Sequence, residues 1–73
     1  MKVQKMSRKV LEKTVDQIFT TYCHGVQFDI FDLGKVLNAI RSALLGSFDQ
    51  PESERMAYIE ARVLVAVATY RKN

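Results

Sequence analysis

The expected architecture rests mainly on residues 49–73, which read DQPESERMAYIEARVLVAVATYRKN. Asp49 can cap a helix with Glu52 three residues later, and Pro51 suits the first turn because its missing N–H does no harm there. The basic residues near the other end suit the negative pole of the helix dipole. We therefore predict a helix over residues 50–72, which at 1.5 Å per residue would be about 33 Å long and the longest in the chain.

The faces of this helix are too apolar for so small a chain to cover alone. Between Val63 and Ala68 no side of the helix carries a polar residue. Helical spacing directs one stripe toward the core, formed by Met56, Ile59, Val63, Ala66, Val67 and Tyr70. The remaining apolar lines need a cover, and we expect an interface formed by Ala57, Tyr58, Ala61, Leu64, Val65 and Ala68. A strand over residues 63–70 is the competing interpretation, but length, caps and period favour the helix.

The first segment is predicted to be a helix over residues 7–23. Ser7 is the expected N-cap, and Gly25 can adopt the left-handed conformation just past the end. One apolar face follows the helical period and is formed by Leu11, Val15, Ile18 and Tyr22, with Phe19 and Val10 widening it.

The second segment is predicted to be a helix over residues 30–45. Either Asp29 or Asp32 can cap it, and Gly46 and Ser47 are expected to end it. Its apolar stripe is the cleanest in the chain and is formed by Leu33, Val36, Leu37, Ile40, Ala43 and Leu44.

Residues 26–30 connect these two helices and alternate between apolar and polar side chains, as a strand does. Five residues without a second strand nearby cannot form a stable sheet. We therefore interpret them as an extended connector that places Phe28 in the core. An edge strand that pairs across a dimer is the alternative.

These segments predict an all-α fold and a single helical domain over residues 1–73. The arrangement expected is a three-helix, up-down-up array with a long C-terminal helix. A chain of 73 residues buries only about 60 to 65% of its unfolded surface, so its stability as a monomer would be marginal. We expect oligomerisation to complete the fold.

Cysteine content and hydropathy indicate a protein of the cytoplasm. Cys23 is the single cysteine, so no disulfide can form within the chain, and a reducing compartment is expected. No run approaches the roughly 18 apolar residues that a membrane span needs, and no signal-type apolar core follows the N-terminus. We expect no contact with a membrane.

The basic residues are concentrated at the N-terminus. Residues 1–13 contain five basic residues and one acidic residue, a net charge of +4, so the remaining residues sum to −1 in a chain of net charge +3. Nucleic-acid binding through Lys2, Lys5, Arg8, Lys9 and Lys13 is one functional alternative. A helix-turn-helix motif is disfavoured, because Glu52 and Glu54 would lead its second helix toward the phosphates.

No catalytic or metal site is predicted. Cys23 and His24 are the only pairing of a nucleophile with a base, and adjacent residues on a helix point apart. A metal site needs three or four ligands at diagnostic spacing, which one cysteine and one histidine do not supply. We expect a protein that is not an enzyme and has no cofactor.

Aromatic and cationic residues suggest a small-ligand alternative, because they can stack on bases and hold phosphates. The candidate ligand or phosphate contacts are Tyr22, Lys9, Lys13, Arg62 and Arg71.

A resemblance supports this alternative. Pro51-Glu52-Ser53, Ile59-Glu60, Val63-Leu64, Ala66 and Arg71-Lys72-Asn73 are similar to the C-terminal helix of the small phage anti-CBASS proteins. The resemblance covers about a third of the chain and implies a compact helical oligomer that binds cyclic oligonucleotides between subunits. Val65 departs from the family pattern, which usually has an aromatic residue at that place. The first two segments do not match that family.

The leading functional expectation is a helical interaction protein, similar in kind to small phage or plasmid regulators and inhibitors. It would act by presenting an apolar helix face to a second copy of itself or to a host protein. The alternatives are an oligomeric sponge for cyclic oligonucleotides and the electrostatic nucleic-acid binder described above.

Overall fold

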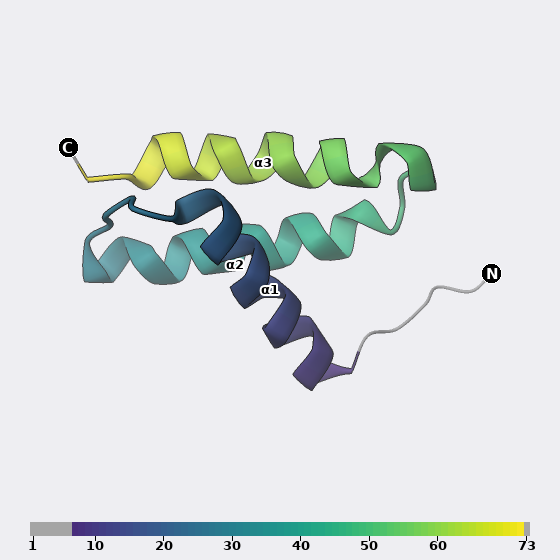
Figure 1. Ribbon diagram of the computed structural model, residues 1–73, viewed down its shortest axis with the longest axis horizontal. Helices are drawn as coiled ribbons and strands as arrows, with labels where there is room; N and C mark the ends of the chain where they lie inside the picture. Colours follow the sequence, from purple (N-terminus) through teal and green to yellow (C-terminus); the bar gives the residue numbers. More distant parts are fainter. Residues whose placement is uncertain (1–6, 73) are drawn as a thin grey trace.

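The computed structural model describes residues 7–72 and contains three α-helices joined by short connections. The helices are α1 (Arg8–Cys23), α2 (Ile30–Ser47) and α3 (Arg55–Tyr70), and a short 3-10 helix, η1 (Glu52–Glu54), precedes α3. Figure 1 shows α2 and α3 side by side and antiparallel, with α1 crossing α2 obliquely. The all-α, three-helix fold expected from the sequence is confirmed. The basic N-terminal end, residues 1–6, and Asn73 lie outside the described residues.

The start of α1 and its end follow the sequence signals. The Ser7 side chain accepts a hydrogen bond from the Val10 N–H at 3.2 Å, as an N-cap does. Gly25 has a φ of +78°, the left-handed conformation expected just past a helix end. The Val26 N–H closes this turn by donating to the Cys23 carbonyl at 2.9 Å.

The second helix starts where expected but runs further than predicted. Asp29 occupies the N-cap position of α2, although its side chain makes no capping hydrogen bond. The helix includes both Gly46 and Ser47, so it ends two residues after the predicted Leu45, and Gly46 does not end it. Gly46 continues the helix because it does not take the left-handed conformation. Ser47 is buried, and its hydroxyl donates to the Leu44 carbonyl at 2.6 Å.

The third helix is shorter than predicted at both ends. Pro51 has extended backbone (ψ 146°), so the expected capping box of Asp49 and Glu52 does not form, and the chain enters through η1. At the other end, Arg71 is extended (ψ 144°) and pairs with Phe28 in an isolated antiparallel bridge. As a result α3 has 16 residues and α2, with 18, is the longest helix.

The connector between α1 and α2 fastens three helix ends together. Phe28 packs against the core, with its ring 6.1 Å from that of Phe19 on α1. The Lys72 N–H donates to the Gln27 carbonyl at 2.7 Å, and the Lys72 ammonium lies 3.6 Å from the Asp29 carboxylate. The pairing of residues 26–30 seen here is therefore made within the chain.

The core lies where the three helices meet. It combines residues of α1, α2 and α3, namely Val15, Cys23, Val36, Ile40, Leu44, Ile59, Val63 and Val67. Met56 was predicted to belong to this core, and that prediction is wrong: 65% of its surface is exposed. Because α3 begins at Arg55, Met56 lies in its first turn, at the end of α3 farthest from the α1–α2 connector. Across residues 7–72, no helix combines the length and apolar character that a membrane crossing requires.

Candidate interaction surface on the third helix

One side of α3 packs on the rest of the protein and the other is left open. Ile59, Val63, Ala66 and Val67 are buried. The two residues that follow the buried Val63 in sequence point elsewhere, and Leu64 is 48% and Val65 65% exposed. Ala57, Ala61 and Ala68 are also exposed, and Tyr58 is half-buried. The residues expected at an interface are therefore accessible in the single chain.

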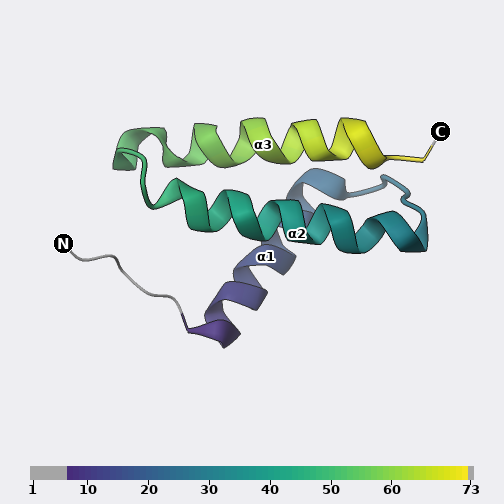
Figure 2. The same ribbon diagram turned by 180° about the vertical axis from the view of Figure 1, so that it is seen from behind.

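These exposed residues belong to two surfaces with different directions. Figures 1 and 2 show α3 along one long edge of the molecule, with α2 on its inner side. We call the exposed line of α3 formed by Ala57, Ala61, Leu64 and Ala68 the outer face. Tyr58 and Val65 instead line a groove between α2 and α3, and Ala61 borders both surfaces.

The groove is lined mainly by small residues, together with two tyrosines. Its volume is about 620 Å³, and it is lined by residues of α2 and α3: Ala39, Ser42, Ala43, Tyr58, Ala61, Arg62, Val65, Ala66, Thr69 and Tyr70. None of these lining residues comes from α1, which packs elsewhere on the hairpin. The groove is thus a shallow, mainly apolar concavity formed by two helices alone.

Each tyrosine of the groove carries a cation over its ring. The Arg62 guanidinium carbon lies 4.4 Å from the ring centroid of Tyr58. The Lys35 ammonium lies 5.8 Å from that of Tyr70 and 3.7 Å from the Asp32 carboxylate. Such pairs hold a positive charge over an aromatic face. The sequence did not predict that Lys35 lies over Tyr70, because the two residues belong to different helices.

The candidate ligand contacts do not gather at one place. Arg62 lies at the groove, whereas Lys9 and Lys13 are exposed on α1. Tyr22 packs against the core. Arg71 follows the last residue of α3 and donates its N–H to the Val67 carbonyl. The single chain therefore builds no pocket from these five residues.

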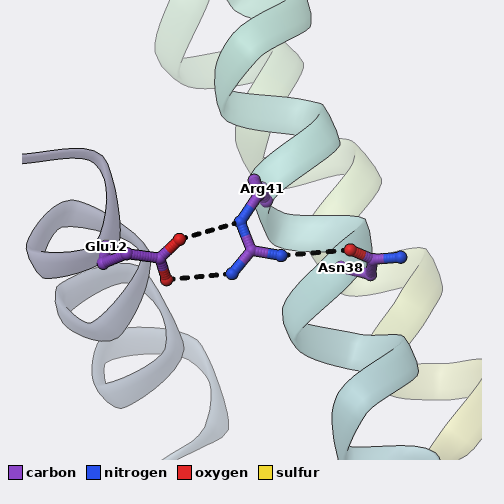
Figure 3. A network of polar contacts seen from close by, with 3 residues as sticks. All are labelled: Glu12, Asn38 and Arg41. Carbon is purple, nitrogen blue, oxygen red and sulfur yellow. Dashed lines mark hydrogen bonds and ion pairs between the residues drawn. The ribbon is translucent and has the colours of Figure 1, made fainter. Parts of the chain in front are cut away.

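A polar cluster fixes α1 on α2, as Figure 3 shows. Arg41 on α2 donates two hydrogen bonds to the Glu12 carboxylate of α1, at 2.9 and 3.2 Å, and a third to the Asn38 amide oxygen at 3.0 Å. The hydrogen-bonded Arg41 guanidinium lowers the pKa of Glu12, and Glu12 in turn raises the pKa of Arg41. Because Glu12 and Arg41 are 29 residues apart, no local sequence pattern predicts this pair.

Cys23 and His24 do not form a reactive pair. Cys23 is buried among core residues, and this burial raises the pKa of its thiol. His24 is exposed and occupies the C-cap position of α1. A buried thiol with a raised pKa holds little thiolate, which is the nucleophilic form.

Neither a metal site nor a similar protein indicates a function for the described part of the chain. Within the part of the chain that the structure describes, no three His, Cys, Asp or Glu residues are placed to hold a metal ion. No protein-family model, curated protein or solved structure matches this chain. The functional assignment therefore rests on the surfaces of α3.

Proposed function

We propose that this chain is a non-enzymatic helical interaction protein that acts through self-association and protein binding, with the exposed side of α3 as its contact surface. The observation that supports this is the exposure of Leu64 and Val65 in the middle of α3, flanked by exposed alanines. Alanines let a second helix approach closely, and the larger aliphatic side chains supply apolar area.

The free energy expected from burying these exposed side chains is large enough to favour association. Fully burying a leucine or valine side chain contributes about 1.5 to 3 kcal/mol, so burying the exposed part of Leu64 and Val65 contributes on the order of 1 kcal/mol for each side chain. A symmetric contact counts every side chain twice. The partner is therefore a second copy, or a host protein that presents a complementary apolar helix, as small phage or plasmid regulators and inhibitors do.

Sedimentation of the purified protein over a range of micromolar concentrations tests this proposal. We expect a mass that rises with concentration toward a dimer or a larger oligomer. A monomer at every concentration, together with failure to recover a partner from a lysate, would remove the support for an interaction protein.

A second candidate is an oligomeric sponge for cyclic oligonucleotides, and the groove is the observation that favours it. Tyr58 and Tyr70 offer aromatic surfaces, while Arg62 and Lys35 offer positive charge beside them. These are the groups that stack on bases and attract phosphates.

Calorimetry against a panel of cyclic di- and trinucleotides separates the two candidates. If the groove holds the nucleotide, Arg62→Ala should abolish the heat of binding. The matched control is Arg55→Ala. The Arg55 guanidinium carbon lies 5.8 Å from the ring centroid of Phe48, and neither residue lines the groove. Absence of heat across the whole panel with the unmodified protein rejects this candidate.

A further inference from the structure

The outer face of α3 continues beyond its apolar residues into a charged residue at each end. Positions 54, 57, 61, 64, 68 and 71 follow one another at spacings of 3, 4, 3, 4 and 3, the seam spacing of two helices that pack lengthwise. The six residues at these positions, which we call the seam, are all exposed: Glu54, Ala57, Ala61, Leu64, Ala68 and Arg71. Glu54 is the N-cap and Arg71 the C-cap of α3, so the seam spans the whole helix.

This series is complementary to itself when it is reversed. Its midpoint falls between Arg62 and Val63, which is also the midpoint of α3. If a second α3 lies antiparallel about that point, Glu54 faces the partner's Arg71 at both ends. Ala57 then faces the partner's Ala68, and Ala61 faces the partner's Leu64. Opposite charges meet, and Leu64, the one large apolar side chain of each seam, meets a small one.

We propose that two copies of this chain associate through the outer faces of their α3 helices, antiparallel and related by a twofold axis at the middle of α3. This inference rests on the proposed self-association and specifies its surface and register. A twofold contact uses the same patch on both copies, which the reversed complementarity of the seam satisfies.

The fold leaves room for this arrangement. In both ribbon views α3 lies along one long edge of the described part of the molecule, with α2 on its inner side and α1 crossing α2 (Figures 1 and 2). The residues of α3 that pack on the core, Ile59, Val63, Ala66 and Val67, are buried, whereas every residue of the seam is exposed. A second α3 on the outer face would not displace α1 or α2.

Charge selects the antiparallel orientation. A parallel pair would set Glu54 against the partner's Glu54 and Arg71 against the partner's Arg71, which places like charges at both ends. The ion pairs formed within the described residues use Glu12, Asp29 and Asp32 with their basic partners and leave out Glu54 and Arg71. The end charges of the seam are therefore available to a second copy.

Reversed-charge variants test the register directly. Glu54→Arg alone places arginine against arginine at both ends of the pair, and Arg71→Glu alone places glutamate against glutamate. Each variant should weaken self-association about tenfold at low salt, because two attractive contacts become repulsive. When the two variants are mixed, both ends become complementary again. Native mass spectrometry of the mixture should then show mainly the mixed dimer.

The controls are the unmodified protein and the matched variant Glu52→Arg, which makes the same charge change as Glu54→Arg on an exposed residue outside the seam. Circular dichroism of every variant confirms that the helices remain folded. If the variants associate as well as the controls and the mixed dimer has only its statistical abundance, the antiparallel seam is overturned while self-association stands. An unmodified protein that is monomeric under the same conditions overturns both the seam and the proposed function.

Discussion

The hydroxyl of Tyr58 on α3 lies directly against Gly46 on α2: a Cβ at Gly46 would be 2.8 Å from the Tyr58 Oη and 3.4 Å from the nearest ring carbons. Gly46 is inside α2 and needs no left-handed conformation. Its role is to leave space for the tyrosine. The ring of Tyr58, over which Arg62 lies, is also part of the groove lining.

Replacing Gly46 with alanine should therefore have an effect that depends on residue 58. Alanine in a helix interior stabilises by about 1 kcal/mol relative to glycine. In the unmodified chain the contact with the hydroxyl offsets this gain. In a Tyr58→Phe background the hydroxyl is absent, and Gly46→Ala should raise the free energy of unfolding in urea by up to about 1 kcal/mol. An equal gain in both backgrounds would contradict the contact.

The Glu12 to Arg41 pair should make the stability sensitive to acid. The pKa of Glu12 is lower in the folded protein than its ordinary value of 4.5, because Arg41 stabilises the carboxylate. The stabilisation is therefore complete above the unfolded pKa and is lost as the pH falls through the folded pKa. Glu12→Gln should flatten the fall of the melting temperature between pH 5 and pH 3. Asp16→Asn on the same helix is the control, and an equal flattening there would remove Glu12 as the cause.

The Cys23 thiol should react slowly in the folded protein. It is only 4% exposed, and burial raises its pKa, so both access and thiolate content are low. At pH 8, an aromatic disulfide reagent should modify it far more slowly in buffer than in denaturant. Equal rates in the two solutions would show that Cys23 is accessible.

Charged substitutions should separate the core of α3 from its exposed surface. Val63 has no exposed surface and Ile59 is 5% exposed, so an aspartate at either place buries an unpaired charge and should unfold the chain. Leu64→Glu and Val65→Glu should leave the circular dichroism spectrum unchanged. We expect Leu64→Glu to dissociate the oligomer more completely, because Leu64 lies on the seam and Val65 lies in the groove. If all four variants behave alike, the division of α3 into these surfaces is wrong.

The presence of the helices could be predicted from sequence, and the ends of α3 could not. Apolar periodicity places all three helices, because their buried faces repeat with the helical period. The α3 helix starts later than predicted because Pro51 has extended backbone where the first turn of the helix was expected. It ends earlier than predicted because Arg71 pairs with Phe28, 43 residues earlier in the sequence. A contact of that range leaves no local signal.

The interface residues were predicted as one group, and the structure divides them between two directions. Periodicity tells which residues share a side of α3, but the position of α2 decides which exposed residues border a groove. For this reason the sequence predicted no groove within the single chain, and it did not place Lys35 beside Tyr70. Gly46 was interpreted as a helix end, although its spacing role depends on Tyr58, a residue of the next helix.

The connector around Phe28 sets a gradient of local stability along α1. It joins the end of α1, the start of α2 and the end of α3 at one place, through the Phe19 to Phe28 ring contact and the pairing with Arg71. The other end of α1 lies away from α3 in Figure 1, and Val10 there is half exposed. Opening of α1 should begin at that end. Amide protons of its first turns should exchange with solvent before those near Cys23, while α2 and α3 stay protected.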